Sequence, residues 1–388
     1  MALTALTGAR VFTGSRFLDG HAVLIDGAGI AGVAPAAELP ADIRVEALGG
    51  GILAPGFIDA QVNGGGGVLF NQTPDAASLG RLAAAHAPFG STALLPTFIT
   101  DHPEGMSQAI AAARQAIAAG VPGIAGIHLE GPFLSVARKG AHDPALIRPL
   151  TDADVDLILD AGIGTILLTV AAENAAPRLI RRLVEGGVTV SLGHTDASYE
   201  TAMAAADAGA RGVTHLFNAM SQLQHRTPGV VGAALAHGGL WCGIIADGHH
   251  VHPAALAIAL RAKQGPGRLF LVTDAMPPAG DSGDVFILNG RRVTRRDGVL
   301  TLDDGTLAGS DLVMDAGLRY AVGHLGLAPG EALRMASLYP AEFLGLDRDR
   351  GRIVAGHRAD LVHLDDELAA RRTWIGGEVH PARRPEQG

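Results

Sequence analysis

Short apolar runs alternate with alanine-rich segments of helical period through most of this chain. The apolar runs that end in polar residues are eight in number, and they cover 52–59, 92–100, 124–130, 165–171, 188–194, 212–218, 241–247 and 268–274. The segments of helical period include 76–89, 104–119, 152–161, 175–186, 198–209 and 253–264. Such alternation is typical of parallel strands connected by helices. Eight strand-helix units are the number that a closed (β/α)₈ barrel requires.

The two ends of the chain have a different pattern. Residues 1–50 contain short β-like runs broken by Gly, Asp and Pro, and strand-like runs return over 350–380 after helical patterns at 311–323 and near 330–345. We expect the two ends to pair with each other. The predicted fold is therefore α/β, and it consists of a (β/α)₈ TIM-type barrel with a small β-sandwich domain built from both chain termini. The barrel would cover 53–349 and the small domain 1–52 and 350–388.

The composition suits one large buried interior. Hydrophobic residues make up 48% of the 388 positions and charged residues only 18%, which excludes a disordered chain. The formal charge of -9 and the lack of a long basic run argue against nucleic acid as the partner. A small anionic substrate would need a local cationic pocket instead.

The chain shows no targeting or membrane signal. No charged segment followed by an apolar one opens it, and no apolar stretch reaches the roughly 20 residues that span a bilayer. The single cysteine, Cys242, stands among apolar residues, which favours a packing role. We expect a cytoplasmic protein that interacts with neither a membrane nor nucleic acid.

The polar residues that close the eight runs are the candidates for chemistry, because barrels of this type carry their active sites at the carboxyl ends of the strands. They are Asp59, Gln61, Thr97, Glu130, Glu173, His194, His215, Asn218, Asp247, His249, His250 and Asp274. Glu130 ends its run directly before Gly131 and Pro132, at the start of a turn. A carboxylate there requires a cation, hydrogen bonds or a metal to offset its burial.

Glu130, His194 and His215 together form a two-histidine, one-carboxylate set. Such a set suits one divalent metal; zinc fits it well, and iron, cobalt or manganese fit it also. An open coordination position would hold a water whose pKa falls toward about 7. Asp274 can then take a proton from that water and give it to a leaving nitrogen. The set is sufficient for amide hydrolysis.

Some of these residues also admit a purely structural interpretation. Asp274 alone is equally well explained as a helix N-cap, and Asp59 as a residue that only orders the first loop. His128 shares a strand face with Glu130 and belongs either to the core or to the support of the site. The glycines of 64–67 lack the following Lys-Ser/Thr and the GxGxxG spacing of a phosphate-binding loop, so they argue against nucleotide binding.

Motifs along nearly the whole chain resemble the amidohydrolase superfamily and, within it, the family of N-acetylglucosamine-6-phosphate deacetylases. The matching stretches include LAPGFIDAQVNGGGGVLFN (53–71), GIHLEGPFL (126–134), KGAHDP (139–144), SLGHTDAS (191–198), GVTHLFNAM (212–220), HRTPGVVGAAL (225–235), IIADGHHVHP (244–253), LVTDAM (271–276), LAGSDLVMD (307–315) and GRIVAGHRADLVHLD (351–365). PGFID and RADLV mark only the superfamily, whereas HLEGPF, THLFNAM and DGHHV are more specific.

The resemblance implies hydrolysis of N-acetyl-D-glucosamine 6-phosphate to D-glucosamine 6-phosphate and acetate. It implies that Glu130, His194 and His215 hold the metal, and that Asp274 is the acid and base. The alternatives are a related N-acyl amino sugar such as N-acetylgalactosamine 6-phosphate, a nucleobase or cyclic-amide hydrolase, and a non-catalytic scaffold. The full ligand set with Asp274 argues against the scaffold.

The same resemblance implies a substrate site. His142 would polarise the acetyl carbonyl, and the residues that would contact the sugar phosphate are Gln61, Ala141, His142, Asn218, Ala219, Arg226, Asp247, His250, Leu307, Ala308 and Gly309. In the family the arginine equivalent to Arg226 enters the site from the neighbouring subunit, so the resemblance also implies a homodimer. Arg226 and His250 would let an acidic protein bind a phosphate.

The sequence departs from the superfamily after the first strand. Many amidohydrolases carry His-x-His there and bind a second metal, whereas this chain has Gln61 and Asn63. Amides are weak zinc ligands. We therefore predict one tightly held metal per subunit.

Overall fold

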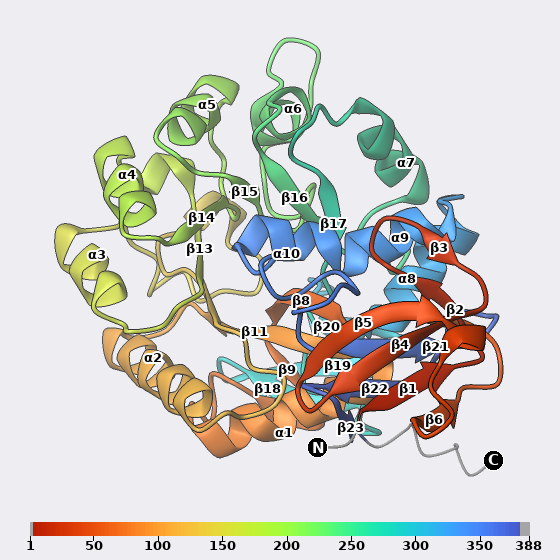
Figure 1. Cartoon of the computed structure of the whole chain (residues 1–388). Helices are drawn as coiled ribbons and strands as arrows, with labels where there is room; N and C mark the ends of the chain where they lie inside the picture. The colour runs from red at the N-terminus through yellow and green to blue at the C-terminus, as the bar shows by residue number, and fades with distance from the viewer. Residues whose placement is uncertain (1–2, 381–388) are drawn as a thin grey trace.

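The computed structural model describes residues 3–380, and its centre is an eight-stranded parallel sheet. The strands are β8 (Phe57–Val62), β11 (Ser91–Ile99), β12 (Ile127–Glu130), β13 (Ile166–Val170), β14 (Thr189–Leu192), β15 (Gly212–Val213), β16 (Trp241–Ile244) and β17 (Leu269–Leu271). They neighbour one another in chain order, from β8 at one edge to β17 at the other. Figure 1 shows helices arranged around the outside of this sheet. The predicted (β/α)₈ TIM-type fold is confirmed.

Hydrogen bonds just beyond β17 close the barrel onto β8. The backbone N–H of Asp274 donates to the carbonyl of Gln61 at 2.9 Å, and that of Asn63 donates to the carbonyl of Ala275 at 2.9 Å. Below these bonds a buried side chain joins the same two segments, because Asp59 accepts a 2.6 Å hydrogen bond from the hydroxyl of Thr273. The closure holds the first and last strand ends together.

The helices follow the strands as the periodicity predicts. They are α1 (Ala76–His86), α2 (Pro103–Ala118), α3 (Asp152–Leu159), α4 (Pro177–Glu185), α5 (Tyr199–Asp207), α6 (Gly229–Ala236), α7 (Pro253–Ala262), α8 (Met314–Gly323), α9 (Pro329–Ala336) and α10 (Leu338–Leu344). Side chains of Asp75, Thr151 and Ser198 cap α1, α3 and α5 at their N-termini. Within residues 3–380, no helix combines the length and apolar character that crossing a bilayer requires.

Three elements differ from the sequence pattern. The run 52–59 divides, so that β7 (Ile52–Pro55) lies in a different sheet from β8. The helical stretch near 330–345 breaks at Ser337, between α9 and α10. Helix α6 was not predicted, because Gly229–Leu235 is buried on all sides and so has no polar face to reveal a period.

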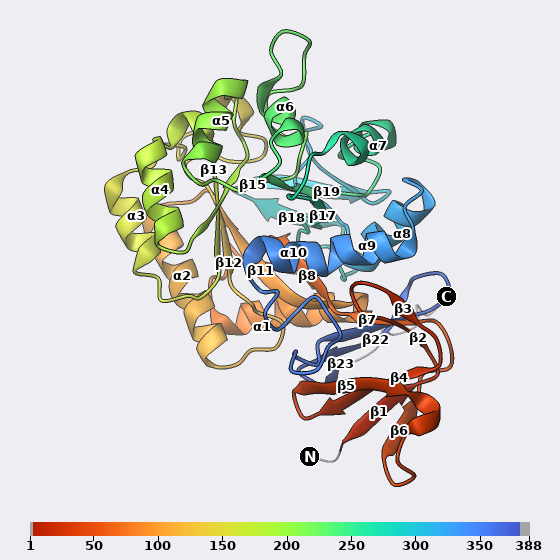
Figure 2. The same cartoon turned by 45° about the horizontal axis from the view of Figure 1, so that its top comes forward.

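Strands from both ends of the chain form one sheet, as expected. In the six-stranded sheet the order is β23 (Glu378–His380), β22 (Ala370–Ile375), β21 (Leu361–Leu364), β7, β2 (Arg10–Phe12) and β3 (Phe17–Leu18). A four-stranded sheet with the order β5 (Gly29–Pro35), β4 (His21–Asp26), β1 (Thr4–Thr7) and β6 (Arg44–Ala47) packs against it (Figure 2).

An apolar cluster joins these two sheets into a sandwich, with Leu6 and Val23 from one sheet and Leu53, Leu361 and Trp374 from the other. The proposed domain limits, 1–52 with 350–388 and 53–349, stay a prediction. Of the small domain, residues 1–2 and 381–388 lie outside the described part of the chain.

A three-stranded sheet was not predicted and lies between β17 and α8 in sequence. It contains β18 (Val285–Leu288), β19 (Arg291–Arg296) and β20 (Val299–Leu302). Its first turn is Asn289-Gly290, with φ of 51° and 73°, and such dipeptides favour tight hairpins. Leu288 and Val293 pack with Leu69 of the short strand β10 (Val68–Leu69) and with Ile99, the last residue of β11. This small sheet therefore covers one side of the barrel mouth.

Candidate active site

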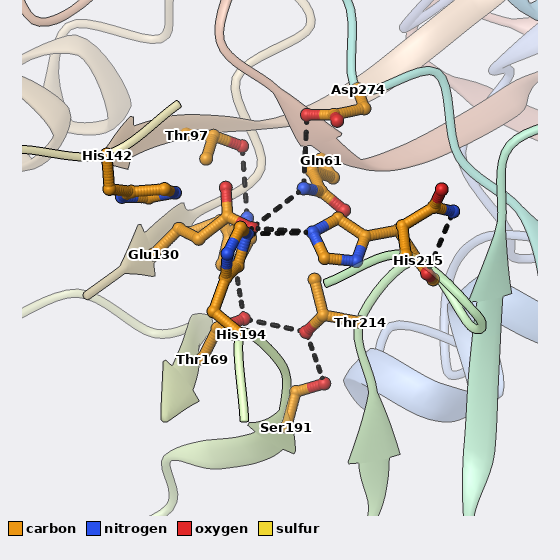
Figure 3. Close-up of polar contacts among 12 residues, drawn as sticks. Gln61, Thr97, Glu130, His142, Thr169, Ser191, His194, Thr214, His215 and Asp274 are labelled. Atoms are coloured by element: carbon orange, nitrogen blue, oxygen red, sulfur yellow. Dashed lines mark hydrogen bonds and ion pairs between the residues drawn. The ribbon is translucent and has the colours of Figure 1, made fainter. Parts of the chain in front are cut away.

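Glu130, His194 and His215 converge at the carboxyl end of the barrel. Glu130 is the last residue of β12, and each histidine lies two residues beyond its strand, β14 or β15. Nε2 of His194 lies 3.0 Å from Nε2 of His215, and the two nitrogens lie 3.2 and 3.1 Å from Oε1 of Glu130. All three side chains are buried, and Figure 3 shows them directed at one point.

The backbone leaves the strands in an unusual conformation at three site residues. The φ angles are +47° at His194, +32° at His215 and +54° at Asp274, in the left-handed region that residues other than glycine seldom occupy. Each such residue costs of the order of 1–3 kcal/mol and persists only where the surroundings impose it. The turn directs these side chains into the barrel mouth rather than along the strand.

The donor set fits a divalent cation. Nδ1 of His194 lies 2.9 Å from the carbonyl oxygen of Arg138, to which a ring N–H donates, so its Nε2 lone pair faces the shared point. A second imidazole nitrogen and a carboxylate oxygen face the same point. Without a cation between them the two ring nitrogens would place lone pairs against each other or require an added proton. In the described part of the chain, one ligand atom from each of the three residues lies within 4.8 Å of the other two, which is close enough for all three to bind the same metal ion.

The charges within this set are strongly coupled. Burial alone would raise the pKa of Glu130, but hydrogen bonds and charge interactions with His194 and His215 hold that pKa well below its usual value. Burial would lower the pKa of His215, and Glu130 reverses the direction so that the pKa is raised. The carboxylate is therefore ionised and available as a ligand.

Asp274 stands beside the metal set and is held by two amides. Its Oδ1 accepts hydrogen bonds from Nε2 of Gln61 at 3.1 Å and from Nδ2 of Asn63 at 2.7 Å. Burial, together with the charge of Glu130, raises the pKa of Asp274 to about 6. A carboxyl group with such a pKa can both accept and donate a proton near neutral pH.

A cavity of about 400 Å³ opens above these residues. Most of the predicted site residues line it, namely Glu130, Ala141, His142, His194, Asn218, Ala219, His215, His250, Asp274, Leu307 and Gly309. His142 and Asp274 lie on different sides of the metal set (Figure 3). Burial, with the charge of His194, lowers the pKa of His142 to about 3, which makes this imidazole neutral.

Four predicted site residues do not line the cavity. Gln61 lies below it and donates to Glu130 as well as Asp274. Asp247 lies behind His250 and its Oδ2 is 2.6 Å from Nδ1 of that ring. Ala308 is fully buried in the cluster under the three-stranded sheet.

Arg226 is the fourth. It is exposed in the loop before α6, which projects from the barrel (Figure 2), and it lines a second hollow of about 340 Å³ that shares Arg138 with the cavity. It makes no ion pair with another residue of the range 3–380. In the described chain this arginine therefore does not line the cavity itself.

His128 belongs to a polar chain in the barrel interior. Its ring bonds the hydroxyls of Thr97 at 3.0 Å and Thr169 at 2.8 Å, and Thr214 and Ser191 continue the chain (Figure 3). Burial lowers the pKa of His128 to about 4, so it is neutral. Of the two interpretations, the geometry favours a satisfied core histidine beneath the metal set.

Sequence reasoning missed residues that reach the site from the three-stranded sheet. Leu288 lines the cavity, and a guanidinium nitrogen of Arg291 donates to the carbonyl of Ala141, beside His142. The signal was present, because Asn289-Gly290 and Asp297-Gly298 stand between the short apolar runs 285–288 and 299–302 and predict hairpin turns. Thr100 was also missed; its hydroxyl contacts His142, and nothing in its local sequence marks it.

Comparison with known proteins places this geometry in context. The amidohydrolase family model matches residues 52–380, and a model described as the NagA composite domain matches residues 4–53. The chain is 45% identical to an N-acetylgalactosamine-6-phosphate deacetylase of Shewanella sp. (strain ANA-3), over 96% of this chain and 94% of that protein.

Two further proteins to which the chain is similar are named for N-acetylglucosamine 6-phosphate instead. The chain is 41% identical to the human N-acetylglucosamine-6-phosphate deacetylase, over 85% of this chain and 84% of that one. It superposes on the crystal structure of the N-acetylglucosamine-6-phosphate deacetylase of Pasteurella multocida with a TM-score of 0.94 and 36% identity, covering 98% and 100% of the two chains.

Proposed function

Because this chain belongs to the amidohydrolase family, we propose that it hydrolyses N-acetyl-D-glucosamine 6-phosphate to D-glucosamine 6-phosphate and acetate. The observation that carries the proposal is the meeting of a complete metal-binding set with Asp274 in one cavity. A scaffold without activity has no need of left-handed backbone at three polar residues of that cavity.

Glu130, His194 and His215 would hold one divalent metal, for which zinc is our choice on the nature of the ligands. When bound, the metal supplies a Lewis acid and lowers the pKa of a water in the cavity. Asp274, ionised, accepts a proton from the attacking water. It then returns that proton to the amine nitrogen as the C–N bond breaks.

His142 acts on the other side of the reacting carbon. Its ring lies edge-on to His194, with 4.4 Å between ring centroids, and it lines the cavity. As a neutral imidazole it can donate one hydrogen bond to the acetyl oxygen, where negative charge develops in the transition state. The proton acceptor and the oxyanion donor are thus separate groups.

The phosphate would be held at the other end of the cavity, by His250 and the backbone of Asn218 and Ala219. Asp247 accepts from Nδ1 of His250 and so turns Nε2 toward the cavity. We also propose a homodimer in which Arg226 of one subunit reaches the cavity of the other. Its exposure, its lack of an ion pair in the described chain and its projecting loop support this arrangement.

We propose one metal per subunit, because Gln61 and Asn63 stand where a second metal would need ligands. Both amides direct N–H groups at Asp274, and Gln61 directs one at Glu130 as well. An N–H group repels a cation, so these hydrogen bonds take the place of a second ion. A cytoplasmic location is also proposed; a buried, unpaired Cys242 and a sugar-phosphate substrate suit a reducing compartment.

The second candidate substrate is N-acetyl-D-galactosamine 6-phosphate, which the name of the Shewanella relative favours. The test is acetate release by metal-analysed protein from each 6-phosphate and from unphosphorylated N-acetylglucosamine. A preference for the first sugar phosphate supports the proposal. Faster turnover of the 4-epimer makes the second candidate the substrate, and no release from any of them contradicts both.

A further inference from the structure

A buried hydroxyl contacts the imidazole that we assign to the acetyl oxygen. Thr100 directly follows β11, only 1% of its surface is exposed, and its Oγ1 lies 2.8 Å from Nδ1 of His142. Gly131 leaves room for this hydroxyl, because a Cβ atom at position 131 would lie 2.3 Å from Oγ1. The contact is therefore built into the packing of the two strand ends.

The direction of this hydrogen bond follows from what surrounds the hydroxyl. Among residues 3–380, Nδ1 of His142 is the hydrogen-bond partner of Oγ1. If the ring donated, the hydroxyl proton of Thr100 would be buried without an acceptor. If the hydroxyl donates, its proton is satisfied and only lone pairs lack a partner. A buried donor without an acceptor is the more costly arrangement, so the hydroxyl donates.

That direction determines where His142 carries its own proton. A neutral imidazole has one N–H, and Nδ1 must be the acceptor when the hydroxyl donates to it. The proton then lies on Nε2. With the opposite tautomer Nε2 would present a lone pair and could not donate to a carbonyl oxygen. The hydroxyl of Thr100 thus decides whether the ring of His142 has an N–H that can stabilise an oxyanion.

We propose that Thr100 is a positioning residue for His142, whose hydroxyl fixes the Nε2–H tautomer and so leaves an N–H for the carbonyl oxygen of the substrate. The inference rests on the proposed deacetylation for its kinetic consequence, but not for the tautomer itself. Thr100 does not contact the metal set by any hydrogen bond in the described chain.

The kinetic test uses two variants that differ by the hydroxyl. Thr100→Val keeps the shape and removes the donor, and we expect kcat for acetate release to fall about 10- to 100-fold with little change in KM, by analogy with the loss on mutation of residues that orient metal-binding histidines. Thr100→Ser keeps the donor and should stay within about threefold of the wild type. Equal losses in the two variants would show that packing, and not the hydroxyl, is what matters.

A double-mutant cycle separates this role from a general structural one. In a His142→Gln background, Thr100→Val should cause no further loss of kcat, because its effect passes through the ring. A loss as large as in the wild-type background would overturn the proposal. Melting temperature and metal content, measured on all variants, establish that the folded enzyme is compared.

The tautomer is measured without any turnover. Neutron diffraction from crystals of the deuterated, zinc-loaded protein should show a deuteron on Nε2 of His142 and one on Oγ1 of Thr100 directed at Nδ1. A deuteron on Nδ1 would overturn the proposal. If the protein releases no acetate from any of the sugars but shows the expected tautomer, the assigned reaction fails and the assignment of Thr100 stands.

Discussion

Nδ2 of Asn63 donates a 2.7 Å hydrogen bond to Oδ1 of Asp274, so an amide supports the acid-base group at a position where many amidohydrolases carry a metal-binding histidine. The bond favours the ionised carboxylate and opposes the burial and the charge of Glu130 that raise its pKa to about 6. Only the ionised form can take a proton from water. The activity should therefore fall as the pH drops through the pKa of Asp274, and a bound cation moves this fall to lower pH.

Replacing Asn63 with Ala should move that acid limb to higher pH. Loss of the hydrogen bond disfavours the ionised form, and a rise of about one unit in the pKa of Asp274 would lower kcat/KM about tenfold at pH values well below that pKa and hardly at all at pH 8. Full pH profiles of kcat/KM measure the shift. Gln264→Ala is the control, because the side-chain amide of Gln264 is exposed and donates to the backbone of Ala262 at the end of α7, away from the cavity. A uniform loss at every pH would contradict the role given to Asn63.

Asp274→Asn should keep the fold and the metal but lose turnover. The amide cannot accept a proton from water or return one to the amine, and general acid-base groups contribute typically 10²- to 10⁴-fold. We expect a loss of that size in kcat, with the melting temperature and metal content close to those of the wild type. Retained turnover would remove Asp274 from the proton transfers and return it to the alternative role of a structural residue.

The barrel could be predicted from the sequence because each of its strands is an apolar run that is followed by a polar residue. Glu130, His194 and Asp274 could be identified for that reason, since a closed parallel sheet brings all carboxyl strand ends to one face. The left-handed backbone at His194 and Asp274 could not be foreseen, because only the surrounding loops impose it.

Contacts between segments that are distant in the chain could not be predicted from the sequence. Thr100 meets His142 only because the chain after β11 and a loop 42 positions later fold to the same place, and no local pattern encodes that meeting. Helix α6 was not predicted because it is apolar on every side and therefore shows no helical period of apolar and polar residues. The three-stranded sheet over the site, by contrast, could have been predicted, because Asn289-Gly290 is a typical hairpin turn.

Removal of the metal should abolish activity and lower stability. Glu130, His194 and His215 come together only in the folded protein, so a metal that binds them stabilises the folded state. At a metal concentration of 100 times the dissociation constant, this stabilisation is about 2.7 kcal/mol. Chelation should lower the melting temperature, and one equivalent of zinc per chain should restore it together with acetate release. Glu130→Gln should bind zinc weakly, whereas Asp311→Asn, a partly buried carboxylate paired with Arg295, should bind it normally. Two tightly held equivalents per chain in metal-replete protein would contradict the single-metal proposal.

Arg226 provides the sharpest test of the proposed dimer, because it is exposed and lies outside the cavity of its own subunit. Arg226→Ala alone should raise KM for the sugar phosphate, since a charged donor to the phosphate is lost. If the arginine acts across the subunit boundary, two impaired chains can complement each other. A heterodimer of Arg226→Ala and Asp274→Asn chains contains one site with both Asp274 and Arg226 intact.

Co-expression of the two variants in equal amounts should therefore give dimers with about a quarter of the wild-type number of intact sites, given random pairing of the subunits. Acetate release at a substrate concentration below KM would rise accordingly above that of either variant alone. Protein mixed after separate purification, without subunit exchange, is the control and should show no gain. Activity of the co-expressed sample no higher than the mean of the two variants would show that Arg226 does not serve the neighbouring site.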